Sequence, residues 1–90
     1  MRQAAIPTPA APTVVKDDGS GEHQYAIIAV GVQGRRTVAS RTTKAGGLAR
    51  LRWDSVPGAD AYLVVRDGQE IAGPLRIEGS QKEWVDKAVR

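Results

Sequence analysis

The alternation of apolar and polar residues predicts a chain built from short β-strands. Residues 49–53 read Ala-Arg-Leu-Arg-Trp, as in a strand with one face in a core and the other in water. Residues 25–30 and 61–66 are apolar at both parities, so both faces of these strands should be at least partly covered. Because no segment has a helical period of useful length, the pattern predicts an all-β antiparallel sandwich of about seven strands, with further strands at 13–16, 36–42, 69–71 and 81–86.

Turn residues separate these runs. Pro57-Gly58 fits the centre of a type II turn, and Asp67-Gly68 is a strong signal for a two-residue hairpin. Gly34 predicts a second hairpin, in which residues 36–42 return antiparallel to residues 22–32. Trp53 is expected in the core.

The first residues have a different composition. Residues 1–11 are rich in Ala, Pro and Thr, which favours an extended, polyproline-like arm ahead of a sandwich of residues 12–90. We expect this arm to become ordered only against a partner.

Composition removes most catalytic and metal chemistry. The chain has no cysteine, and its single histidine, His23, excludes a metal site with two imidazoles and a pair of histidine acid and base. No G-x-S-x-G motif is present, and residues 17–22 (DDGSGE) lack the twelve-residue pattern of an EF-hand. We therefore expect no enzymatic activity, no cofactor, no bound metal and no small-molecule substrate.

Charge and hydropathy bear on partners and localisation. Net charge is +3, with eight Lys or Arg against three acids in residues 1–52 and five against seven in residues 53–90. This asymmetry either steers one copy toward another or reflects ordinary solvated faces. All four aromatic residues fall in strands expected to be packed, so we expect no nucleic-acid partner.

No segment reads as a signal peptide, and none has the roughly 20 apolar residues of a transmembrane helix, so membrane insertion is not expected. If Met1 is the natural start, the product is made in the cytoplasm and stays soluble, or leaves within an assembly or by lysis, which suits a part of a virion. An extracellular location is the alternative.

Three segments resemble the fibronectin type III domain. Residues 51–68 (LRWDSVPGADAYLVVRDG) resemble its second and third strands, with Trp53 as the core tryptophan and Tyr62 as the third-strand tyrosine. Residues 25–40 (YAIIAVGVQGRRTVAS) are similar to its sixth and seventh strands, and residues 83–86 (EWVD) to the end of its fifth. The resemblance covers about 60 residues and implies an immunoglobulin-like β-sandwich.

The order of these segments departs from the family, in which the hairpin resembling residues 22–42 closes the domain. Here the hairpin precedes the tryptophan strand. The hairpin either folds back in cis, giving a permuted sandwich, or completes a neighbouring copy in trans. A third alternative is a fragment of a tandem array cut out of phase with its domains.

The resemblance places the two central strands in one sheet, and this predicts an apolar outer face. Either that face is a protein interface, or the arm or residues 72–80 fold over it as additional core. The loop after the first of these strands presents two arginines, for which solvation is the simpler reading. The candidate interface residues are Ile6, Pro7, Pro9, Ile28, Val30, Arg35, Arg36, Leu63 and Val65.

Modules of this family resemble those of bacteriophage virions and of secreted bacterial enzymes. We therefore expect a noncatalytic structural or binding protein, a capsid decoration or tail accessory protein that docks on a repetitive protein surface. Its partners would be capsid or tail subunits, or further copies of itself. The alternatives are a carbohydrate or cell-surface binding module, for which Trp84 is the candidate exposed aromatic, and a spacer domain of a secreted bacterial enzyme.

Overall fold

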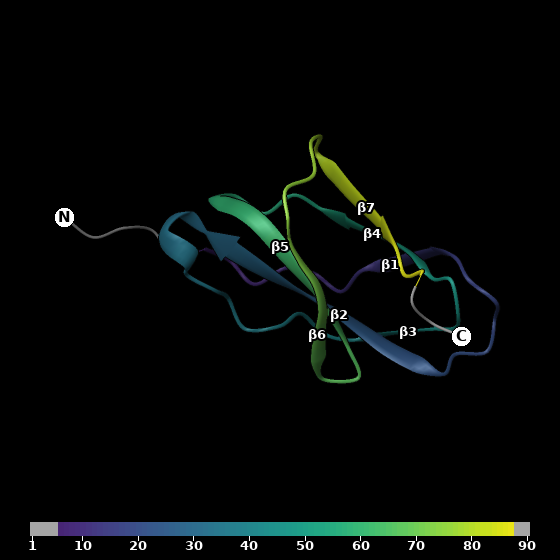
Figure 1. The fold of residues 1–90 in the computed structure, drawn as a ribbon. Coiled ribbons are helices and arrows are strands. Elements are labelled where there is room, and N and C mark those ends of the chain that lie inside the picture. Colours follow the sequence, from purple (N-terminus) through teal and green to yellow (C-terminus); the bar gives the residue numbers. More distant parts are fainter. Residues whose placement is uncertain (1–5, 88–90) are drawn as a thin grey trace.

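The computed structural model describes residues 6–87, without the side chain of Gln33, and folds them into two antiparallel sheets (Figure 1). A three-stranded sheet has the order β1-β4-β7, and a four-stranded sheet has the order β3-β2-β5-β6. Within the described residues this confirms the predicted all-β sandwich. The strands are β1 (Thr13–Lys16), β2 (His23–Gly31), β3 (Thr43–Ala45), β4 (Arg50–Asp54), β5 (Ala59–Arg66), β6 (Gln69–Leu75) and β7 (Gln81–Val85), and a 3-10 turn, η1, spans Val32–Gly34.

The core lies between the inner faces of the two sheets. The residues of β4 alternate between core and solvent, so Leu51 and Trp53 are buried while Arg50 and Arg52 are exposed. Trp53 is 4% exposed and packs edge-on against the ring of Tyr62, with 5.8 Å between the ring centroids. The expected core position of Trp53 is thus confirmed. The buried core residues are Tyr25, Ile27, Ala29, Ala45, Ala49, Leu51, Trp53, Val56, Tyr62 and Val64.

Both predicted two-residue turns are present. Between β4 and β5, the Ala59 N–H donates to the Val56 carbonyl at 3.0 Å, and Gly58 has a φ of 84°, as a type II turn requires. Between β5 and β6, Asp67 and Gly68 have φ values of 52° and 84°. Positive φ at both central residues is typical of the type I′ hairpin turn, whose twist matches that of the flanking strands.

The hairpin segment of residues 22–42 completes the four-stranded sheet of its own chain. β2 lies between β3 and β5 and pairs with β5 along most of its length. Residues 46–49 then lead from β3, in the four-stranded sheet, to β4, in the three-stranded sheet. Of the arrangements that the sequence leaves open, the structure has the one in cis.

The return of this hairpin is irregular. Instead of a continuous strand over residues 36–42, the structure has one isolated bridge, and regular pairing resumes only at β3. Hydroxyl groups replace the missing ladder carbonyls: the Ile27 N–H donates to Ser40 Oγ at 2.9 Å, and the Ala29 N–H donates to Thr37 Oγ1 at 3.1 Å. The expectation of a regular strand here is wrong, because these side chains compete with the backbone for the same donors.

Residues 6–12 run from one sheet toward the other without forming a strand. Ile6 packs against the core, and its Cδ1 occupies the space that a Cβ on Gly31 would need. At the other end of the segment, Thr43 Oγ1 donates to the Pro12 carbonyl at 2.6 Å, and the chain then enters β1, which pairs with β4. The described part of the predicted arm therefore packs on its own sandwich, and residues 1–5 lie outside the described residues.

Candidate protein interface

The outer face of β2 and β5 is apolar, as the sequence predicts. Directly opposite residues of an antiparallel pair share a face, and the register places three apolar pairs on this side of the sheet, Ala26 with Val65, Ile28 with Leu63 and Val30 with Ala61. Ile28 and Val30 are half-buried, whereas Leu63 and Val65 are only 4% and 8% exposed. Much of the face is therefore shielded from water, and Ile28 and Val30 are its accessible part.

Part of this shielding comes from β6. Gly73 has a φ of 121°, and a Cβ at this position would lie 2.6 Å from Leu63 Cδ2. Only glycine allows the backbone to approach this closely, and it sets the beginning of the 72–80 segment against Leu63. The sequence left open whether residues 72–80 fold over the outer face. The structure shows that they do so at Leu63.

An ion pair joins two residues on opposite sides of this face. Arg36 forms an isolated bridge with Val30, and Glu70 lies opposite Val65, so the two residues flank the face at diagonal corners. The Arg36 guanidinium donates to the Glu70 carboxylate at 2.5 Å, with both side chains about half exposed. An exposed pair of this kind contributes little stability, but the arginine stem covers apolar surface while its charge stays in water.

The rim of the face, formed by Val32 in η1 and Val38 beyond it, is more exposed than the face itself. Val32 and Val38 are 74% and 73% exposed, the highest values among the large hydrophobic residues that the structure describes. Arg35 lies between them in the sequence and has no acidic partner within residues 6–87. Sequence reasoning missed both valines, because each was counted as part of a strand. Their position on either side of the arginine loop was the available signal.

The arm residues of the predicted interface separate into two kinds. Ile6 is half-buried against the core and Pro9 is buried, so both help to close the sandwich. Pro7 is exposed and remains available to a partner. A docking role for the arm stays a prediction.

A buried polar cluster lies at the opposite end of β2. The Tyr25 hydroxyl donates to Asp86 Oδ2 at 2.6 Å, and the Arg66 guanidinium donates to the same oxygen at 2.6 Å. Asp86 is fully buried directly after β7, while the other two residues lie on β2 and β5. Burial, together with the Asp86 carboxylate, raises the pKa of Tyr25 above its usual value. The cluster joins the two sheets and is a structural tie.

A contact between His23 and Asp67 lies next to this cluster. His23 Nδ1 is 2.6 Å from Asp67 Oδ2, and the Gln24 N–H donates to the other oxygen of the same carboxylate at 2.9 Å. These two contacts, His23 first, lower the pKa of Asp67. Since the hairpin residue Asp67 is held against β2, the pair fixes the β5–β6 turn.

The Tyr25 hydroxyl predicts an alkaline loss of stability. The unfolded chain releases this proton near pH 10, whereas the folded chain holds it to higher pH because its pKa is raised. Above about pH 10 the unfolded state therefore binds fewer protons, and the free energy of unfolding falls as pH rises. Urea unfolding between about pH 8 and 11 should show a steeper fall for the wild type than for Tyr25→Phe. Parallel pH profiles would contradict this assignment.

The other surfaces offer little chemistry. Within residues 6–87 no group of three or more His, Asp or Glu side chains is placed to hold a metal ion. No helix in the same part of the chain has the length and apolar character needed to span a membrane. Trp84 is half-buried beside a shallow depression of about 390 Å³ that is lined by Glu83, Trp84, Val85 and Lys87.

No protein-family model matches this sequence, and no match is found among curated proteins or among solved structures.

Proposed function

We propose that this chain is a noncatalytic protein-docking module and that it serves as a bacteriophage virion component, a capsid decoration or tail accessory protein. The docking function is carried by one observation, the apolar outer face of β2 and β5 with Ile28 and Val30 still accessible. Apolar surface outside the core of a small domain is typical of a site that binds another protein. The virion assignment rests on family analogy.

The arrangement of the sheets supports the resemblance to fibronectin type III domains. The segments that resemble the third and sixth strands, β5 and β2, are neighbours in one sheet, and the return of the hairpin leads to β3 in the same sheet. The segments that resemble the second and fifth strands, β4 and β7, pair in the other sheet. These pairings support a permuted sandwich, because they keep the strand neighbours that the resemblance implies.

The exposed residues of the rim indicate the chemistry of the partner. Val32 and Val38 add two exposed apolar side chains after the end of β2, and Arg35, between them in the sequence, adds a positive charge that has no acidic partner within residues 6–87. A partner surface that is apolar with a carboxylate opposite Arg35 complements this arrangement. Such a rim charge contributes mainly to specificity and to the rate of association.

Cosedimentation tests this function. The purified chain is mixed with capsids, and separately with tails, of the phage that encodes it, and the bound copies are counted. We expect binding to one of them that saturates at a fixed number of copies per subunit. Ile28→Lys should weaken binding by about tenfold or more, because docking would bury an unpaired ammonium group.

Val15→Lys is the matched control. Val15 lies in β1 of the other sheet and is 41% exposed, so the same change of charge there should leave binding unchanged. Circular dichroism of each variant establishes that it is folded. If the chain binds neither capsids nor tails, the virion assignment is wrong. If a folded Ile28→Lys variant binds as well as the wild type, the sheet face is not the interface.

A further inference from the structure

Three of the four sheet edges are protected against pairing with another strand. β1 has four residues and a register shift, and β3 has only three residues. β6 contains Gly73-Pro74 and two register shifts. Short, bulged or proline-containing edges of this kind prevent unwanted association of sheets.

β7 is the unprotected edge among the described residues. It pairs with β4 over five consecutive residues without a register shift, and it contains neither proline nor glycine. Its lysine gives no protection, because Lys82 is buried and its Nζ donates to the Ile77 carbonyl and, at 2.7 Å, to the Gly79 carbonyl. The edge is therefore open to a further strand.

The direction of the β7 backbone groups follows from its hydrogen bonds. The Asp86 N–H donates to the Ala49 carbonyl at 2.9 Å, and the Ser55 N–H donates to the Ser80 carbonyl at 2.8 Å. Backbone groups alternate along an antiparallel strand, so even-numbered residues of β7 point toward β4. The backbone N–H and C=O groups of Gln81, Glu83 and Val85 therefore point away from β4, in the plane of the sheet, toward its open edge.

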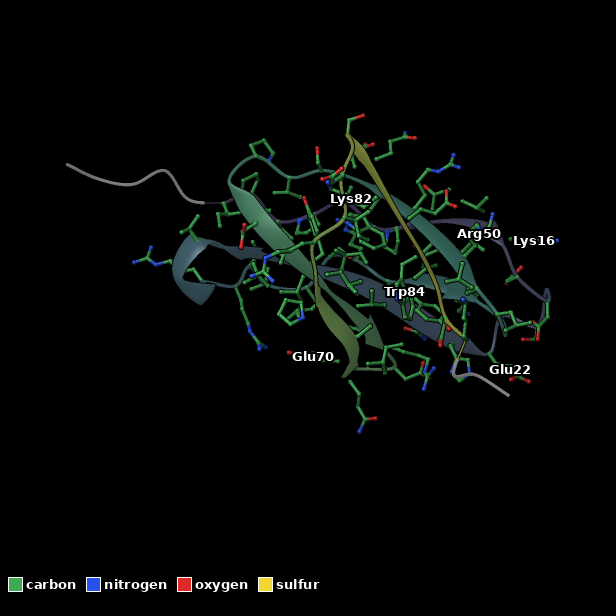
Figure 2. The ribbon with its side chains drawn as sticks, turned by 45° about the horizontal axis from the view of Figure 1, so that its top comes forward. Lys16, Glu22, Arg50, Glu70, Lys82 and Trp84 are labelled. Atoms are coloured by element: carbon green, nitrogen blue, oxygen red, sulfur yellow. The ribbon has the colours of Figure 1, made fainter. Side chains whose placement is uncertain are left out.

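The side chains along this edge are suited to a partner. Trp84 and Val85 are half-buried and line the shallow depression beside β7. On the outer face, Arg52 donates to Glu83 at 3.0 Å, whereas Arg50 lies 3.6 Å from the same carboxylate. Figure 2 shows Trp84 on β7, with Arg50 on the strand beside it. Arg50 therefore has only a loose partner, and its guanidinium is free to donate to a second carboxylate.

We propose that two copies of this chain pair through β7, antiparallel about a two-fold axis at Trp84. This register places the two Trp84 side chains opposite each other and Glu83 opposite Val85 of the second copy. Glu83 and Val85 have outward-pointing backbone groups, so they form hydrogen-bonded pairs and Trp84 a non-hydrogen-bonded pair, in which side chains approach most closely.

The same register is complementary in charge. Val85 pairs with Arg50 in the sheet, so Glu83 of one copy lies in line with the loosely held Arg50 of the other, two strands away with Val85 between them. The separation is about 10 Å between Cα atoms, which the two long side chains span on the same face of the sheet. The contact occurs twice, as a two-fold interface requires. The three-stranded sheets of two copies then join into one continuous sheet. This interface lies on a different sheet from the docking face of the proposed function, so either proposal can fail without the other.

Light scattering over a concentration series tests the pairing. We expect the mass to rise from the 9.6 kDa of one chain to twice that value and then to stay constant. Val85→Glu should raise the dimer dissociation constant by about tenfold or more, because it places a carboxylate directly opposite Glu83 of the other copy at both contacts. Val15→Glu, on the opposite edge strand of the same sheet, should leave it unchanged.

A charge exchange tests the register. Glu83→Arg and Arg50→Glu should each weaken self-association, and an equimolar mixture of the two variants should dimerise again, since an opposite-charge pair is then available at both contacts. A chain that stays monomeric to about 1 mM would overturn the proposal. An unchanged dissociation constant for Val85→Glu, or a mixture of the two charge variants that stays monomeric, would also overturn it.

Discussion

Trp53→Ala is expected to lower the free energy of unfolding by about 3 to 5 kcal/mol, the range for removing a buried tryptophan from a core. Trp53 is 4% exposed, lies on β4 and packs edge-on against Tyr62 of the opposite sheet. Its loss leaves a cavity between the sheets, since neighbouring side chains relax only in part. Because small domains have only about 5 to 15 kcal/mol of stability, the variant should be close to unfolding at 37 °C. Urea titration followed by circular dichroism measures the effect.

Two further variants show whether burial causes this loss. Trp84→Ala removes the same side chain from the half-buried edge of β7 and should cost less. Trp53→Phe keeps a ring in the core and removes an indole N–H that has no hydrogen-bond partner among the described residues, so it should also cost less than Trp53→Ala. Equal losses for Trp53→Ala and Trp84→Ala would contradict the core role of Trp53.

The sequence was sufficient where local chemistry determines the structure. The turn at Gly58 and the hairpin at Asp67-Gly68 follow from backbone conformations that few residues adopt. The burial of Leu51 and Trp53 follows from the two-residue period of a strand. These features depend on residues close in the sequence, and the structure confirms all of them.

The sequence was insufficient where distant residues compete for the same groups. Residues 36–42 have the composition of a strand, yet the hydroxyls of Thr37 and Ser40 take ladder donors of β2 and make the return irregular. The exposure of the outer face likewise depends on Gly73, which approaches Leu63 from β6. The spacing of apolar residues in β2 and β5 does not predict this contact with β6.

The candidate interface was predicted in part for the same reason. The apolar parity of β2 and β5 identifies Ile28 and Val30 correctly as outer-face residues. The rim valines, Val32 and Val38, required knowledge that the chain leaves the ladder at η1. The packing of Ile6 on the core could not be predicted from the local pattern either, because a proline-rich segment has no regular spacing of apolar residues.

Asp86→Ala is expected to cost about 3 kcal/mol, a loss typical of removing one partner from a buried ion pair. Asp86 is fully buried and accepts hydrogen bonds from Tyr25 of β2 and Arg66 of β5, although 61 residues separate it from Tyr25. The variant leaves a buried hydroxyl without its acceptor and a largely buried guanidinium without its counterion. Thermal and urea unfolding should both report the loss.

Asp60→Ala is the matched control for this variant. Asp60 also pairs with an arginine, Arg76 at 3.3 Å, but both side chains are about half exposed or more, so the loss should stay below about 1 kcal/mol. A double-mutant cycle then isolates the tie: Tyr25→Phe should cost less in the Asp86→Ala background than in the wild type, because the phenol no longer has an acceptor to lose. Additive losses would mean that the two side chains stabilise the sandwich independently. In that case the tie between the end of β7 and the start of β2 would not exist, and the contact between these two segments would depend on their other interactions alone.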